Sequence, residues 1–147
     1  MKTSVLLMLL LIALSSCTLS DLFSSSADQA GNRDSFTIEE GETATLSAFD
    51  AALTFVDKSE DSRCPIDVEC IWAGRATVQL RLAVADQPPA SFSLTVGEAP
   101  EQRRDDDGYP VIDTLGLRIT LLDLHPYPDT RVPEPGPSAI DVRVEQP

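Results

Sequence analysis

The run Arg75-Ala76-Thr77-Val78-Gln79-Leu80-Arg81-Leu82-Ala83-Val84 decides the fold of this chain. Its even-numbered positions are all apolar, and its odd-numbered positions include Arg75, Thr77, Gln79 and Arg81. Successive side chains of a β-strand point to opposite faces, so the run predicts a strand with one buried and one wet face. Such strands are typical of antiparallel sheets, because the strands of a parallel sheet are buried on both faces.

The same period of two recurs on both sides of this run, and no helical period competes with it. Apolar and polar residues alternate at 36–39, 46–48, 53–56, 91–96, 117–121 and 140–145. The apolar parity flips between Leu121 and Leu122, as a β-bulge would make it do. The 11 prolines concentrate in connections such as 87–89 and 133–137, where they mark turns or edges. We therefore expect an all-β chain, an antiparallel β-sandwich (Ig-like or barrel-like) of about seven or eight strands.

Residues 1–17 indicate where the protein is located. One lysine precedes an apolar run from Val5 to Leu14, which is too short to cross a bilayer as a stable helix. The sequence Leu14-Ser15-Ser16-Cys17 resembles the lipobox of bacterial lipoproteins, in which the signal is cut just before the cysteine. The resemblance implies a signal peptide of residues 1–16 and several acyl chains on Cys17, enough for stable anchoring. The alternative is an ordinary secretory signal with an incidental cysteine.

The lipoprotein resemblance also divides the chain. Residues 17–34, rich in Ser, Gly, Asp and Asn, form the lipidated N-terminus and a flexible tether, and 35–147 form a single β domain. Thr18 stands where an aspartate would suggest retention at the inner membrane in lipoproteins of enteric bacteria. We expect a protein of the cell envelope, lipid-anchored in the outer membrane and facing the periplasm or the surface.

The net charge of −13 argues against nucleic acid and anionic lipid as partners. With 11 Lys and Arg against 24 Asp and Glu, no basic patch exists that would bind nucleic acid or adsorb to anionic lipid. The acidity is consistent either with solubility outside the cytoplasm or with binding of a cation or a basic partner.

The cysteines predict one disulfide. Lipidation would use Cys17 and leave Cys64 and Cys70 as the only pair, and two close cysteines in an exported chain favour a bridge. Closing a loop of about seven residues would stabilise the fold by roughly 2.4 kcal/mol on the chain-entropy model, less any strain. A metal site would need more ligands than two thiols and the distant His125 provide.

The predicted bridge bounds a candidate binding loop, made of Pro65, Ile66, Asp67, Val68 and Glu69. Trp72 alternates with Cys70, so we expect its indole on the face that carries the disulfide. Arg63 is expected to pair with one of its acidic neighbours, which are Glu60, Asp61 and Asp67.

Ser-Arg-Cys-Pro at 62–65 and Cys-Ile-Trp-Ala-Gly at 70–74 are similar to a segment shared by small uncharacterised exported bacterial proteins. The similarity extends loosely over 36–82 and to Leu-Leu-Asp-Leu-His-Pro-Tyr-Pro at 121–128, and it implies no particular activity. The antibody-type order of Cys, Trp and Cys is absent, because Trp72 follows both cysteines.

Two interpretations of the loop remain open. In one it is a recognition surface, such as an inhibitor loop inserted into a protease cleft, since a stiff loop loses little entropy on binding. In the other it is a covalent staple that orders an irregular connection, with Ile66 and Val68 facing the core.

Two further segments carry weaker hypotheses. Asp105, Asp106 and Asp107 precede Gly108 and offer oxygen ligands for Ca²⁺, but their spacing is not that of an EF-hand, and a solvated turn is the alternative. The only histidine, His125, stands between Leu124 and Pro126, and no Gly-x-Ser-x-Gly elbow accompanies it. We expect it to pack at a strand end against Tyr127, and we do not expect an enzyme.

Together these features predict a lipid-anchored envelope protein with a non-catalytic binding or structural role and no required cofactor. Its partners are the membrane, through Cys17, and an envelope protein. An enzyme inhibitor acting through 65–69 and a Ca²⁺-binding module centred on 105–107 are the alternatives.

Overall fold

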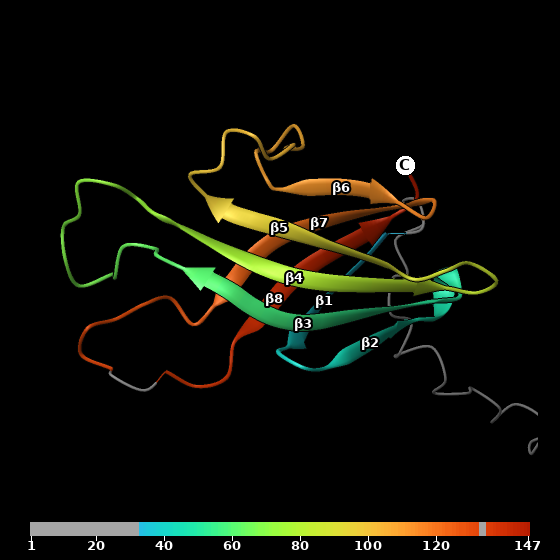
Figure 1. Cartoon of the computed structure of the whole chain (residues 1–147), viewed down its shortest axis with the longest axis horizontal. Coiled ribbons are helices and arrows are strands. Elements are labelled where there is room, and N and C mark those ends of the chain that lie inside the picture. Colours follow the sequence, from blue (N-terminus) through green and yellow to red (C-terminus); the bar gives the residue numbers. More distant parts are fainter. Residues whose placement is uncertain (1–32, 133–134) are drawn as a thin grey trace, which may run out of the picture.

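The strands form two four-stranded antiparallel sheets that pack face to face (Figure 1). The computed structural model describes residues 33–132 and 135–147. The first sheet has the order β1 (Arg33–Glu39), β8 (Ala139–Glu145), β7 (Leu117–His125), β6 (Val111–Thr114). The second sheet has the order β2 (Thr43–Leu46), β3 (Ala51–Asp61), β4 (Arg75–Val84), β5 (Ala90–Gly97). The predicted antiparallel β-sandwich is confirmed, and its eight strands agree with the expected number.

The predicted signal peptide, Cys17 and the tether up to residue 32 lie outside the described residues. β1 begins at Arg33, so Arg33 and Asp34, which the sequence assigns to the tether, belong to the strand and pair with Glu145 and Val144. No helix within 33–132 and 135–147 is long and apolar enough to cross a membrane.

The core lies between the two sheets and is filled by their inward faces. β4 coincides with the run that predicted it, and its Val78, Leu80 and Leu82 are fully buried. The side chains that face them from the other sheet include Ile119, Leu121, Leu124, Ile140, Val142 and Val144. The alternation read from the sequence is therefore the inside–outside alternation of the sandwich.

Two local features refine the predicted strands. The pairing of β7 with β8 shifts register between Leu121 and Asp123, and Leu124 is buried, so the predicted bulge is confirmed. The prediction that the strand containing Leu46 continues to Ala48 is wrong. β2 ends at Leu46, because a short 3₁₀ turn, η2 (Ser47–Phe49), bends the chain and brings Phe49 into the core.

The two ends of the sandwich carry different features. The connection that follows β3, residues 62–74, and the part 126–132 that follows β7 extend beyond one end (Figure 1). β1 begins at the other end, near the C-terminus, where Arg33 pairs with Glu145.

Shortening a core side chain of β4 tests the inward face. Leu80→Ala should lower the free energy of unfolding by about 2 to 5 kcal/mol, because the truncation loses buried apolar contact and leaves a cavity. Arg81→Ala, on the exposed face of the same strand, should change it by less than about 0.5 kcal/mol. Urea denaturation of both variants is the measurement, and equal losses would contradict the assigned faces.

Candidate functional site

Two loops far apart in the sequence meet at one end of the sandwich. Residues 62–74 join β3 to β4, and residues 126–138 join β7 to β8, in the other sheet. Their neighbouring parts are joined by a buried guanidinium and by several hydrogen bonds. This end of the molecule carries most of the residues that the sequence singles out.

The guanidinium of Arg63 is the centre of the junction, and its side chain is almost entirely buried. Its Nε and Nη2 donate to the two carboxylate oxygens of Asp61 at 2.9 and 2.8 Å. Its Nη1 donates to the carbonyl of Leu124 at 2.6 Å, and Nη2 also donates to the carbonyl of Pro126 at 2.9 Å. The Tyr127 ring lies against it, with the guanidinium carbon 4.6 Å from the ring centroid. We call this set of contacts the Arg63 clamp.

The clamp confirms that Arg63 pairs with an acidic neighbour, and it identifies Asp61 as that neighbour. Burial raises the pKa of the Asp61 carboxyl, but hydrogen bonds from Arg63 and Lys58 outweigh burial and lower that pKa overall. Asp61 is therefore ionised near neutral pH, as a buried guanidinium requires.

A second set of hydrogen bonds joins the loops outside the clamp. The amide of Ile66 donates to the carbonyl of Pro128 at 2.9 Å. The amide of Thr130 donates to Asp67 at 2.9 Å, and the Thr130 hydroxyl donates to the other oxygen of the same carboxylate. These bonds lower the pKa of the Asp67 carboxyl. Asp67 therefore binds the neighbouring loop rather than Arg63.

The predicted disulfide between Cys64 and Cys70 is confirmed, with their Cα atoms 5.9 Å apart. The neck of the loop is closed by backbone hydrogen bonds, from Cys64 to Ala73 at 2.9 Å and from Ser62 to Arg75 at 2.7 Å. A glycine is required at position 74, because its φ is +71° and a Cβ there would lie 1.9 Å from the Ser62 carbonyl oxygen.

The apolar side chains of this loop are exposed. Ile66 is 64% exposed, Val68 44%, Ile71 92% and Trp72 72%. The interpretation in which Ile66 and Val68 face the core is wrong, because the loop extends past the end of the sheets where no core lies (Figure 1). We call Ile66, Val68, Ile71 and Trp72 the apolar tip.

The structure separates the three candidate calcium ligands. Asp105 accepts the amide of Tyr109 at 2.8 Å and a guanidinium nitrogen of Arg143 at 2.7 Å, while Asp106 and Asp107 are exposed. Asp105 thus fixes the 105–109 turn to β8. Among the described residues, no group of three or more His, Cys, Asp or Glu is arranged to hold a metal ion.

His125 is the last residue of β7, at a strand end as expected. Its Nε2 lies 2.9 Å from an Asp141 oxygen and 3.7 Å from an Asp123 oxygen, on the exposed face of the first sheet. The ring of Tyr127, the neighbour that the sequence suggests, lies against the Arg63 guanidinium. Hydrogen bonds from Thr37 and His125 lower the pKa of the Asp141 carboxyl.

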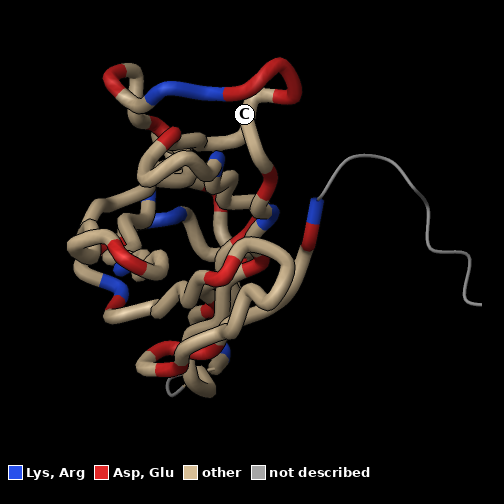
Figure 2. Tube along the Cα trace, turned by 90° about the vertical axis from the view of Figure 1, so that its right-hand side faces the viewer, with Lys and Arg blue, Asp and Glu red and all other residues tan. Residues whose placement is uncertain are grey.

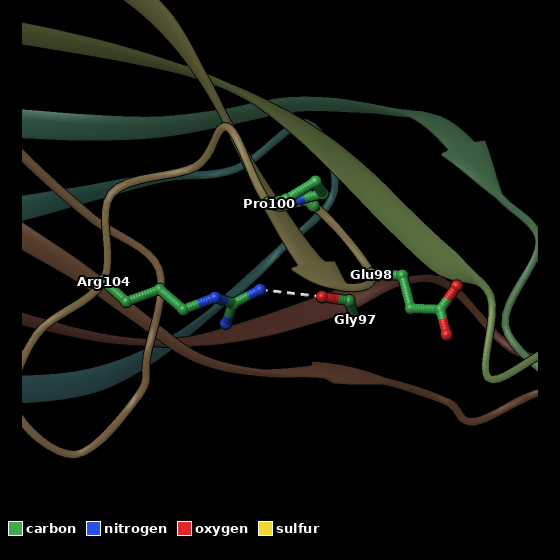
Figure 3. A pocket seen from close by; sticks show the side chains of 5 residues that line it. Gly97, Glu98, Pro100 and Arg104 are labelled. Atoms are coloured by element: carbon green, nitrogen blue, oxygen red, sulfur yellow. Dashed lines mark hydrogen bonds between the residues drawn. The ribbon is translucent and has the colours of Figure 1, made fainter.

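A shallow pocket at the end of β5 is lined by Gly97, Glu98, Ala99, Pro100 and Arg104 (Figure 3). Arg104 donates to the carbonyls of Gly97 and Gly108, each at 2.7 Å. Glu98 points away from Arg104 (Figure 3). The guanidinium is thus occupied with backbone carbonyls, and the pocket brings no acid–base pair together.

Sequence reasoning missed two parts of the tip region. Ile71, the most exposed of its apolar side chains, lies outside the predicted loop 65–69. The segment 126–132 was not assigned to the site either, although its Pro-Tyr-Pro sequence is a sign of a rigid surface loop. No family model matches this chain, and neither a curated protein nor a solved structure matches it.

Replacing Arg63 should separate the loops. Arg63→Met should lower the free energy of unfolding by about 3 to 5 kcal/mol, because it removes the guanidinium from the Asp61 carboxylate and leaves the carbonyls of Leu124 and Pro126 without this donor. Arg131→Ala removes an exposed ion pair with Asp129 and should change the free energy of unfolding far less than Arg63→Met does, because water and salt screen exposed pairs. Urea denaturation measures both, and amide exchange at 126–132 should accelerate only in Arg63→Met. Equal effects would show that the clamp does not hold the loops together.

Acid should release Arg131 from Asp129. A side-chain hydrogen bond from Arg131 lowers the pKa of the Asp129 carboxyl from 3.8 to about 2. The ion pair therefore contributes fully to the stability of the fold at pH values above the ordinary carboxyl pKa of 3.8. This contribution is lost as the pH falls through about 2, where Asp129 becomes protonated. Carboxyl NMR should find the Asp129 midpoint near 2 in the parent chain and at a higher pH in Arg131→Ala, where only the backbone amide of residue 131 still donates to this carboxylate. An unchanged midpoint would contradict the pairing.

Proposed function

We propose that this chain is a lipid-anchored, non-catalytic recognition protein of the bacterial cell envelope that presents the apolar tip to a protein partner. The observation that carries the proposal is the tip itself, four exposed apolar side chains of which two lie inside the disulfide-closed loop and two directly follow Cys70. Exposed apolar side chains gathered in one place are typical of interaction sites, and aromatic residues such as Trp72 often dominate binding energy.

The loop is rigid enough to bind at low entropic cost. The disulfide, the neck hydrogen bonds and the hydrogen bonds that Thr130 donates to Asp67 restrain its backbone before any partner arrives. A preorganised loop pays less conformational entropy on association than a mobile one. On binding a partner, only the side chains of the tip would lose further conformational freedom.

The geometry of the sandwich fits anchoring at one end and binding at the other. β1 begins at the end opposite to the tip, and its seven residues span roughly 23 Å at about 3.3 Å per residue. An acylated Cys17, connected through the residues before Arg33, would hold that end toward the bilayer. The tip would then face away from the membrane.

An enzyme inhibitor is the second candidate, since inhibitors present stiff loops of this kind. The amide of Val68 donates to the carbonyl of Pro65 at 3.3 Å, so 65–68 is a turn rather than an extended, substrate-like segment. This turn favours general recognition through the tip over insertion of 65–69 into a protease cleft.

Crosslinking and affinity capture from intact cells test the proposal. The parent chain should capture a defined envelope protein, and the double variant Ile71→Ser/Trp72→Ser should lose it, because both exposed anchors are removed. Val56→Ser, which changes an exposed apolar residue on β3, should capture the same protein as the parent.

The anchor is tested in the same cells with Cys17→Ser. This variant should no longer incorporate labelled palmitate, because the acylated thiol is gone. Identical captures by the parent and the tip variant would reject the recognition role, and equal palmitate incorporation by the parent and Cys17→Ser would reject the lipid anchor.

A further inference from the structure

The apolar tip is bordered by acidic groups that outnumber the basic ones. The charged residues of the two loops outside the clamp are Asp67, Glu69, Asp129 and Arg131 within the described parts. Arg131 lies 2.6 Å from an Asp129 oxygen and 3.9 Å from an Asp67 oxygen, so one cation serves two carboxylates. The border of the tip is therefore negative. We call Asp67, Glu69 and Asp129 the acidic rim.

Glu69 is the rim carboxylate that remains for a partner. It is exposed, and within 33–132 and 135–147 no cation lies within ion-pair distance of it. It stands between Val68 and Cys70, one residue from the disulfide and two from Ile71. Its position on a stapled loop fixes a negative charge beside the exposed apolar side chains.

This charge argues against two occupants of the tip. A two-fold dimer formed through the tip would place the acidic rims of the two copies in contact, and contacts between like charges are unfavourable. Loops that enter lipid headgroups carry Lys and Arg around their apolar residues, whereas this rim is acidic. Over the whole chain 24 Asp and Glu stand against 11 Lys and Arg, and acidic segments recur along the described trace (Figure 2).

We propose that the tip docks into an apolar pocket of a protein partner whose edge carries a Lys or Arg that pairs with Glu69. The inference rests on the proposed function and adds the chemistry of the partner. Trp72 and Ile71 fill the pocket and supply binding energy. The pairing with Glu69 selects partners with a basic edge and raises the association rate, an effect that salt weakens.

Site-specific photocrosslinking in living cells tests the charge requirement. A benzophenone amino acid in place of Ile71 should form one discrete adduct with a protein in otherwise native full-length chain. Adding Glu69→Lys should reduce the adduct at least about tenfold, because repulsion replaces attraction at the basic edge. Asp34→Lys makes the same charge change on β1 at the other end of the domain and should leave the adduct unchanged.

The chain contains a single tryptophan, so its fluorescence reports on the tip alone. The full chain reconstituted in phosphatidylcholine or phosphatidylglycerol vesicles with brominated acyl chains should show no quenching of Trp72. Quenching would identify lipid as the occupant and overturn the inference. An adduct of twice the chain's mass would identify a second copy and also overturn it.

The remaining outcomes separate the inference from the function on which it rests. A protein adduct that persists in Glu69→Lys would reject the basic edge but keep recognition through the tip. No adduct at position 71 in any variant would reject both.

Discussion

The hydrogen bonds of the Arg63 guanidinium are the interaction on which the arrangement of the two loops depends. The guanidinium carries a positive charge into a nearly dry position and satisfies that charge with Asp61 at the end of β3. Two of its hydrogen bonds go to the carbonyls of Leu124 and Pro126, from the other sheet. A buried cation is costly unless every partner is in place, so the two loops are held in a single arrangement.

The strands were predictable because their signal is local. In each alternating segment, the apolar positions indicate which side chains face inward. The change of apolar parity at Leu121 likewise indicates the position of the bulge without reference to any other strand. For the ion-pair partner of Arg63, the sequence left three acidic residues as candidates. The choice of Asp61 depends on carbonyls 61 and 63 residues along the chain, and a local pattern contains no information about them.

The exposure of the tip was not predictable for a related reason. Ile66 and Val68 alternate with polar residues as core side chains do, so their sequence is compatible with either environment. Their location is decided by where β3 ends and β4 begins, because the connection between them extends past the end of the assembled sandwich (Figure 1). The core is complete without the tip, so Ile71 and Trp72 contribute little to stability and are free to serve binding.

The pairing of β1 with β8 has a consequence for how the chain reaches its final form. Arg33 and Glu145 are bonded across 112 positions, so the first strand has no neighbour within its sheet until the last strand exists. During synthesis the N-terminal strand leaves the ribosome first. It therefore stays unpaired until nearly the whole polypeptide has been made. Such long-range pairing delays folding, because the chain between the two strands must close on itself before their contacts can form.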